Sequence, residues 1–401
     1  MEADYFTGPL GGLTDAEWDE TAQGHFYSSA FWLRLVALEP GAVSGGAHVP
    51  LPGGGRAAVP LAATEPDGMT NPHLCWHDQL TERGLPGPAS GGVLVAQRRG
   101  YLAHLLTTPG ADRVEAAGAL LEAVRSMPDP LGPSGAPSGP ARVAMYLTTP
   151  DVLALRAAGV RALPVALTAD ASLAIPEGGW EEWLTTMGSG HRRRRVRSEV
   201  RKFEQAGYRV EHRVLRDCYA DVGRLAARTE QRYGIAGSAD AYIEAFRKHA
   251  ELAGDRAEVL LCSLGGKPPV GCCLYVRDGD TVYLRAVGFE YEQLLGAAEY
   301  FNLAYYIPAR MPGVRRLHAG IATPGGKALR GADLTPLWLL DLTPGSPLEG
   351  HEAEIQAHNS AFVKRLTAES PAVAKALDTE EWQALCTRGE WPTPGSRAAG
   401  V

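Results

Sequence analysis

Few folds are compatible with the order of elements predicted in the second half of this 401-residue chain. Apolar periodicity predicts helices over residues 191–206, 218–233 and 239–252, and strands over 208–215, 258–264, 270–277 and 281–287. A helix over 296–309, a strand over 314–319, a short helix near Lys327 and a strand over 337–342 follow. A helix pair with an antiparallel meander, then helix, strand, helix and strand, indicates a layered α+β fold with mixed sheets flanked by helices.

The first half of the chain predicts elements of the same kinds. A helix is expected over 26–38, a strand over 57–63, a helix over 110–126 and a strand over 141–147. The Pro/Gly/Ser-rich residues 128–140 cannot hold a regular element and predict a long surface loop within this domain. We therefore predict two domains, 1–168 and 169–345, and a helical extension over 346–401, although the letters show no clear internal repeat.

Composition excludes several classes of protein. The chain is 45% hydrophobic and 21% charged, as globular proteins are. No apolar run reaches the roughly 18 residues of a membrane span, and the first residues lack the features of a secretory signal, so we expect a cytoplasmic protein. The net charge of −7 argues against a surface that binds nucleic acid everywhere, so any polyanion site must be local.

Positive charge is concentrated in one predicted helix, residues 191–206 (HRRRRVRSEVRKFEQA). The apolar residues Val196, Val200 and Phe203 fall on one core-facing stripe of this helix. Three arginines lie four residues apart on a neighbouring face: Arg193, Arg197 and Arg201. Such a row can hold phosphate groups through bidentate guanidinium contacts, or it can be a solvated charged face.

The segment 300–338, YFNLAYYIPARMPGVRRLHAGIATPGGKALRGADLTPLW, carries the most specific motif. It resembles the FemAB-like acyltransferases, whose pattern is an aromatic-acid-x-x-Tyr-Tyr helix, a strand, Ala-Gly and then Lys-x-x-Arg-Gly. The residues that keep this pattern are Phe301, Tyr305, Tyr306, Ala319, Gly320, Lys327, Arg330 and Gly331. Asn302 stands where the family usually has Glu, and the loop 321–326 is longer. The basic helix, followed by a glycine and a strand, is a second match.

The resemblance implies a tandem of two GNAT-like domains, of which the first is expected to lack chemistry of its own. Fem-type enzymes transfer an aminoacyl group from aminoacyl-tRNA to an amine, and their GNAT relatives transfer acyl groups from coenzyme A. We accordingly predict Lys327 and Tyr305 as catalytic residues, Arg330 as a contact of the donor, and Asn302 and Tyr306 as contacts of the acceptor. Because Asn302 replaces an acid, no acid-dependent step is carried over. No tightly bound cofactor is expected.

Lys327 is the candidate that the chemistry favours most. Lysine is rare in this arginine-rich chain, so the lysine of GGKALRG is expected there for its compact ammonium group. A fixed cation beside the carbonyl oxygen of an acyl-transfer reaction is worth roughly 3 to 4 kcal/mol. We expect Lys327 to be exposed, so that its replacement leaves folding unchanged.

His318, at a predicted strand end, is a candidate general base. Because Tyr305 and Tyr306 point about 100° apart on a helix, one of them is expected in the core.

A second short pattern points to a different donor. Residues 293–298 fit the Gln-x-x-Gly-x-Ala pyrophosphate loop of GNAT enzymes, with Gln293 and Gly296 as candidate contacts of the donor. Backbone N–H groups at the start of a helix can hold pyrophosphate oxygens. An ordinary helix start is the alternative interpretation.

Metal binding is not predicted. His73, Cys75 and His77 alternate in a predicted strand, which would place three possible ligands on one face. A closed zinc site also needs a fourth ligand, and the sequence offers none at a matching spacing.

Three functions are compatible with these motifs. The first is an acyltransferase that forms an amide bond by transferring an aminoacyl group from aminoacyl-tRNA to a small molecule or peptide, such as a cell-wall precursor or a specialised metabolite. The second is an N-acyltransferase that uses an acyl-coenzyme A. The third, from another class, is a noncatalytic protein whose arginine helix binds a polyanion. The sequence predicts neither the acceptor, nor the transferred group, nor the oligomeric state.

Overall fold

The computed structural model describes residues 3–38, 42–64, 71–96, 99–127, 139–235 and 237–395. The chain divides into two compact units, one formed by Met1–Asp170 with Thr335–Val401 and the other by Ala171–Leu334. Residues 335–345, which the sequence placed in the second domain, therefore lie in the first unit. The predicted helical extension over 346–401 belongs to the same unit.

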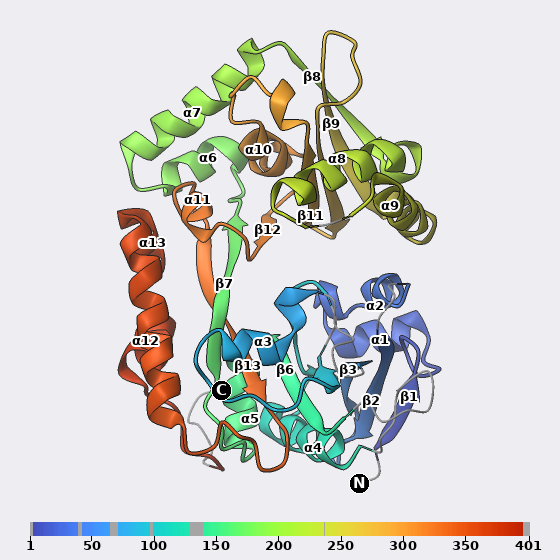
Figure 1. Ribbon diagram of the computed structural model, residues 1–401, viewed down its shortest axis with the longest axis vertical. Coiled ribbons are helices and arrows are strands. Elements are labelled where there is room, and N and C mark those ends of the chain that lie inside the picture. The colour runs from blue at the N-terminus through green and yellow to red at the C-terminus, as the bar shows by residue number, and fades with distance from the viewer. Residues whose placement is uncertain are drawn as a thin grey trace. The chain divides into compact units, whose positions relative to one another are not determined.

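The first unit is built on a sheet with the strand order β1-β2-β3-β4-β6-β13-β7 (Figure 1). The strands are β1 (Asp4–Thr7), β2 (Val43–Pro50), β3 (Arg56–Thr64), β4 (Gly92–Val95), β6 (Ala141–Leu147), β13 (Asp333–Asp341) and the first part of β7 (Val165–Ala174), with β5 (Leu106–Thr107) beside β3. The helices are α1 (Asp15–Ala22), α2 (Ala30–Val36), α3 (Trp76–Thr81), α4 (Arg113–Ser126), α5 (Thr149–Ala157), α12 (Glu352–Glu369) and α13 (Pro371–Ala376). Strands β1 to β4 form an antiparallel meander, β4 runs parallel to β6, and β6 runs antiparallel to β13.

The second unit has the same strand plan, built from the end of β7 and five other strands. Its order is β7-β12-β11-β10-β9-β8, where β8 to β11 form the meander, β11 runs parallel to β12, and β12 runs antiparallel to the end of β7. The strands are β8 (Tyr208–Val214), β9 (Ala257–Leu264), β10 (Gly271–Asp278), β11 (Thr281–Phe289) and β12 (Arg316–Gly320). The helices are α6 (Gly179–Thr186), α7 (Gly190–Gln205), α8 (Tyr219–Arg232), α9 (Ala239–Ala253), α10 (Glu299–Phe301), the π-helix η6 (Asn302–Tyr306), the 3₁₀-helix η7 (Pro308–Arg310) and α11 (Pro324–Ala328).

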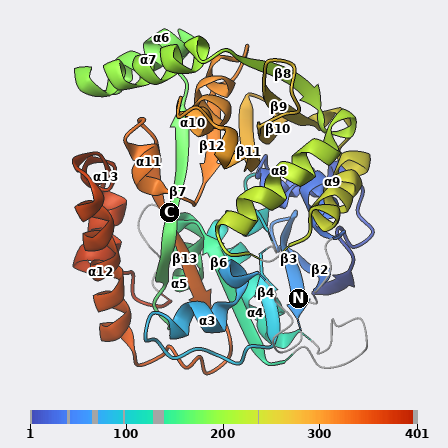
Figure 2. The same cartoon turned by 45° about the horizontal axis from the view of Figure 1, so that its top comes forward.

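Helices cover both faces of the second sheet. A Cβ atom on Gly288 would lie 2.4 Å from the carbonyl carbon of Leu225 in α8, and one on Gly271 would lie 3.3 Å from the side chain of Leu303 in the π-helix. Gly288 pairs with Cys272, the neighbour of Gly271 in β10, so the two glycines face opposite sides of the sheet. Helix α8 thus packs on one face, with α9 beside it in both views, and the π-helix packs on the other (Figure 1, Figure 2).

The parallel pair β11 and β12 diverges along its length. The register of the pair ends at Tyr283 and His318. Strand β12 ends soon afterwards at Gly320, whereas β11 continues to Phe289. The last residues of β12, Ala319 and Gly320, are therefore not paired with β11, and this is the strand end that Lys327 reaches.

The structure confirms the predicted α+β class with mixed sheets and helices, and most predicted elements lie within a few residues of those observed. Two local predictions are wrong. The helix expected over 296–309 starts only at Glu299 and changes to π and then to 3₁₀ geometry. Residues 72–81 form a 3₁₀-helix and α3 instead of a strand, so the argument that placed His73, Cys75 and His77 on one face of a strand does not apply.

Most of the predicted loop 128–140 lies outside the described residues. In the described ranges, no helix combines the length and apolar character needed to cross a membrane.

Candidate active site

Helix α7 presents an apolar stripe to the core of the second unit. Ser189 precedes the helix, and its Oγ accepts a hydrogen bond from the N–H of Arg192 at 3.5 Å, as an N-cap residue does. Val196, Val200 and Phe203 are buried, which confirms the predicted core-facing stripe. The other faces of the helix therefore point away from the core.

The arginines of α7 lie on those outer faces. Arg197 and Arg201 are exposed, and Arg193 is half-buried. Arg197 forms an ion pair with Glu181 at 3.0 Å, in which both side chains are more than half exposed. Within the described part of the chain, Arg193, Arg194 and Arg201 form no ion pair. The first turn contains no acidic residue, so the positive end of the helix dipole and several guanidinium groups coincide.

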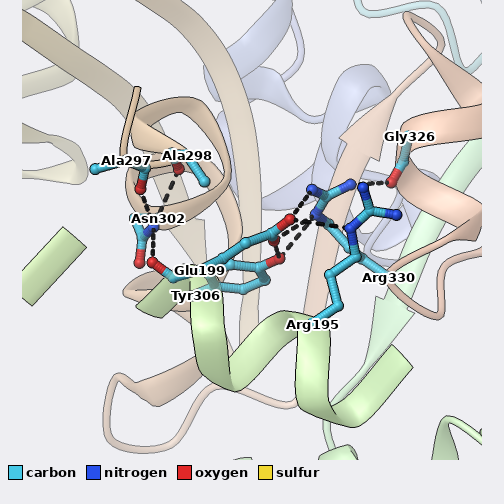
Figure 3. A network of polar contacts seen from close by, with 8 residues as sticks. All are labelled: Arg195, Glu199, Ala297, Ala298, Asn302, Tyr306, Gly326 and Arg330. Carbon is cyan, nitrogen blue, oxygen red and sulfur yellow. Dashed lines mark hydrogen bonds and ion pairs between the residues drawn. The ribbon is translucent and has the colours of Figure 1, made fainter. Parts of the chain in front are cut away.

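A buried polar network joins α7 to the segment that carries the Lys-x-x-Arg-Gly motif (Figure 3). Arg330 donates from Nη2 to Oε1 of Glu199 at 2.8 Å, from Nε to Oη of Tyr306 at 2.7 Å, and from Nη1 to the carbonyl of Gly326 at 2.9 Å. Tyr306 in turn donates its hydroxyl to Glu199. Arg195 reaches the same carboxylate at 3.3 Å from the solvent side. Arg330 is only 5% exposed, so its guanidinium binds these buried partners and is not available to a phosphate at the surface.

Both tyrosines of the Tyr-Tyr pair are buried. Tyr306 faces Glu199 and Arg330, while the Oη of Tyr305 lies 3.4 Å from that of Tyr300 on another side. Burial raises the pKa of both phenols far above the ordinary value, so both remain protonated at neutral pH. The expectation that the two side chains diverge holds, but both belong to the interior. The π-helix that carries them is a form that often occurs at functional sites.

Asn302 ties the π-helix to its neighbours. Its Nδ2 donates to the carbonyl of Ala298 at 3.0 Å, to that of Ala297 at 3.3 Å and to that of Glu199 at 3.4 Å (Figure 3). The side chain is 2% exposed. The amide therefore fixes the loop before the helix against α7, a role that needs a donor and that a carboxylate at this position could not fill.

Lys327 is buried at the end of β12. Its Nζ donates to the carbonyls of Ala319 and Gly320, both at 2.7 Å, and the side chain is 1% exposed. The expectation of an exposed lysine is therefore wrong, because the backbone carbonyls left at the end of the strand hold the ammonium inside the unit. His318 lies directly before these carbonyls, is 4% exposed and packs against the ring of Tyr283. The structure thus places the Lys327 amine group at the end of β12, beyond the last residue paired with β11.

The predicted pyrophosphate loop is already occupied by a carboxylate of the chain. Oε1 of Glu299 accepts hydrogen bonds from the N–H groups of Leu295 and Ala297, both at 3.0 Å, and from Oη of Tyr208 at 2.7 Å. Gln293 and Gly296 are exposed on the outer side of the same loop. The loop does not fit a pyrophosphate group, because the amides of Leu295 and Ala297 are already bonded to the carboxylate of Glu299.

Of the predicted site residues, Tyr306, Arg330 and Asn302 meet through Glu199, whereas Tyr305 faces away from this network. Sequence reasoning missed Glu199 and Glu299. Position 199 falls between Val196 and Phe203 on the core-facing stripe, and an acid on such a stripe predicts a buried partner. Glu299 follows directly after the Gly-x-Ala sequence of residues 296–298, and an acid at such a place indicates that its carboxylate accepts hydrogen bonds from the amides of the turn.

Comparison with known proteins agrees with this geometry. Residues 190–300 match the family model described as an acetyltransferase (GNAT) domain. The crystal structure of FemX is similar with a TM-score of 0.55 and 14% sequence identity, over 86% of this chain and 98% of that one. A conserved protein of unknown function from Bacteroides thetaiotaomicron VPI-5482 is similar with a TM-score of 0.52 and 10% identity, over 83% of this chain and 99% of that one. None of the curated proteins matches. Residues 190–300 of the chain are thus similar to a GNAT acetyltransferase domain, and the chain has the fold of FemX.

Proposed function

We propose that the protein transfers an aminoacyl group from aminoacyl-tRNA to the amine of a small molecule or peptide. The observation that carries this proposal is the group of arginines on α7, of which Arg193, Arg194 and Arg201 have no carboxylate partner among the described residues. Arg193 and Arg194 lie near the start of the helix, where a cation opposes the dipole at a cost of about 0.3 to 1 kcal/mol. Residues that cost helix stability and face outward are best explained by an anionic ligand, and tRNA supplies a run of phosphates.

Lys327 supplies the electrostatic part of the proposed chemistry. The amine nitrogen of the acceptor attacks the ester carbonyl of the donor, a C–N bond forms, the C–O bond to the tRNA breaks, and the proton lost by the amine ends on the released ribose hydroxyl. Negative charge develops on the carbonyl oxygen during this step, and we assign its stabilisation to Lys327, whose Nζ is held by the carbonyls of Ala319 and Gly320. His318 beside it is the candidate for carrying the proton.

The proposal is tested by supplying the protein with total tRNA charged with labelled amino acids and a panel of amines that includes cell-wall peptide precursors. Label should move from tRNA to an amine, and prior treatment with ribonuclease should abolish the transfer. Binding of charged tRNA without any transfer to an amine across the panel, with binding lost in an Arg193→Ala/Arg201→Ala variant, would instead support a noncatalytic polyanion-binding protein.

A second candidate function is favoured by one observation. The match of residues 190–300 to a GNAT acetyltransferase domain supports an acyl-coenzyme A donor. In that case acetyl-coenzyme A would acylate an amine from the same panel, and ribonuclease would have no effect on the rate.

A further inference from the structure

We infer that Glu299 excludes coenzyme A as a donor by filling, with its own carboxylate, the amide cradle that a pyrophosphate would need. This inference rests on the proposed function, because it gives the reason why a GNAT-type unit would accept an aminoacyl ester of tRNA and not a thioester of coenzyme A. It assigns donor specificity to a residue outside the motifs that the sequence singled out.

The geometry around Glu299 is that of an anion site with the anion built into the chain. Three donors converge on one oxygen, Oε1, from Leu295 N at 3.0 Å, Ala297 N at 3.0 Å and Tyr208 Oη at 2.7 Å. The N–H of Leu295 also lies 2.9 Å from Oη of Tyr208, which closes the arrangement. Backbone N–H groups of one loop that point at a single oxygen, as those of Leu295 and Ala297 do, are what a loop uses to hold a phosphate oxygen. Here the carboxylate takes that place.

The carboxylate stays charged in this position. Glu299 is 5% exposed, and burial alone would raise its pKa. The hydrogen bonds from the amides and from Tyr208 outweigh burial, so the pKa of Glu299 is lowered below its ordinary value. A pyrophosphate that approached the loop would meet a fixed negative charge and would find the amides of Leu295 and Ala297 already bonded.

The loop is held in this form from both sides. Ala298 has a left-handed backbone with a φ of 58°, which costs a residue with a Cβ on the order of 1 kcal/mol. Its carbonyl is fixed by Nδ2 of Asn302 at 3.0 Å, and the neighbouring carbonyl of Ala297 accepts from the same amide. The loop is thus rigid, and it follows β11 within the segment that matches the GNAT domain, where that fold would offer its amides to a donor.

The test compares the intact protein with a Glu299→Ala variant, which removes the carboxylate and leaves the three donors in place. The variant should unfold at a temperature lower by about 4 °C or more, because buried donors lose their acceptor. Inorganic pyrophosphate should restore at least half of this loss, with no stabilisation of the intact protein. Acetyl-coenzyme A, followed by calorimetric titration, should bind the variant at least about tenfold more tightly than the intact protein.

The matched control is Glu292→Ala, which removes an exposed acid from the same loop and should respond to neither ligand. A Tyr208→Phe variant, which keeps the carboxylate, should also fail to respond. The inference is overturned if acetyl-coenzyme A binds the intact protein as tightly as the Glu299→Ala variant, or if the variant gains neither pyrophosphate rescue nor affinity. These readouts need no donor turnover, so a failure of transfer from aminoacyl-tRNA would contradict the proposed function without deciding the role of Glu299.

Discussion

The guanidinium of Arg330 and the carboxylate of Glu199 form a two-point ion pair, with Nη2 2.8 Å from Oε1 and Nε 3.3 Å from Oε2. This pair joins α7, which carries the exposed arginines, to the segment that carries Lys327. Any shift of the pair would move the proposed phosphate-binding helix relative to the buried ammonium. Glu199 is therefore a positioning residue, although it was not predicted from the sequence.

Replacing Glu199 by Gln should destabilise the second unit strongly. The change leaves the guanidinium of Arg330, whose side chain is 6% exposed, without its counterion. Breaking a buried ion pair from one side costs about 3 to 5 kcal/mol, and the partial exposure of Glu199 reduces the expected loss to about 2 to 4 kcal/mol. Urea unfolding followed by tryptophan fluorescence measures this loss, since Trp183 of the same unit is buried.

The exposed pair between Arg197 and Glu181 is the matched control. Both side chains are more than half exposed, so a Glu181→Gln variant should lose about 0.5 kcal/mol or less. Equal losses in the Glu199→Gln and Glu181→Gln variants would show that the Arg330 ion pair contributes no more than a surface contact.

Replacing Lys327 by Met should reduce both stability and turnover. Methionine is of similar length but leaves the carbonyls of Ala319 and Gly320 without this donor, which costs about 1 to 3 kcal/mol. Loss of the fixed charge should lower kcat about a hundredfold or more, measured at a temperature where the variant is fully folded. Lys327→Arg should restore little, because the planar guanidinium is bulkier and directs its donors differently.

The control for this change is Lys267→Met, which removes an exposed lysine from the same unit and should leave kcat unchanged. If the folded Lys327→Met variant turns over at a near-normal rate, the ammonium only closes the end of β12, and the chemistry has to be sought at His318 or in the substrates.

Replacing Arg193 and Arg201 by Ala should weaken tRNA binding and flatten its salt dependence. For each phosphate that the variant no longer neutralises, the slope of log K against log salt should become shallower by about 0.7 to 0.9. Arg247→Ala is the matched control, because this arginine is already paired with Glu244 and Glu251 on α9. Filter binding across a salt series measures both effects. An unchanged slope in the double variant would identify the arginine row as a solvated face.

Much of the fold follows from local pattern. Strand β6 (Ala141–Leu147) has the predicted bounds, since an apolar run after a Pro/Gly-rich stretch has one plausible conformation. The buried stripe of α7 is also as predicted, because it depends only on helical periodicity. The sequence could not predict that β13 pairs with strands of the first unit while the end of β7 pairs with β12 of the second unit. Strands β7 and β13 are both apolar, and nothing in such a run says which sheet it joins.

The candidate site was less predictable than the fold because its contacts join distant segments. Lys327 is buried by carbonyls at the end of β12, and no periodicity within GGKALRG indicates that burial. The π-helix differs from an α-helix by a single wider turn, which leaves the Phe-x-x-x-Tyr-Tyr spacing looking helical. Arg330 was predicted as a contact of the donor from the family resemblance, but Glu199 supplies an anion for it from inside the chain.

Two stacked histidines in the first unit give this unit a pH-dependent stability. The rings of His25 and His104 lie 3.6 Å apart at 12°, and Nδ1 of His104 is 3.2 Å from the buried carboxylate of Asp151. Arg113 donates to the same carboxylate at 3.0 Å. Burial, and then the charge of His104, lower the pKa of His25 from 6.5 to about 4. Asp151 and Arg113 act in opposite directions on this pKa and are the other charged groups facing the ring.

The sign of the effect follows from that depressed pKa. The unfolded chain takes up a proton on His25 near pH 6.5, and the folded protein does so only near pH 4, so acidification within this window favours unfolding. A shift of this size corresponds to about 3 kcal/mol at the acid end, and nothing is lost above pH 6.5. Burial alone would raise the pKa of Asp151, but its hydrogen bond to His104 and the charges of His104 and Arg113 lower it. The loss of stability from Asp151 is therefore confined to the acid end of the titration and below. A His25→Phe variant keeps a ring against His104 but cannot take up the proton. Its free energy of unfolding, measured by urea titration at steps between pH 7 and pH 4, should fall less steeply than that of the intact protein. Parallel curves for the two proteins would show that His25 does not titrate differently in the folded and unfolded states.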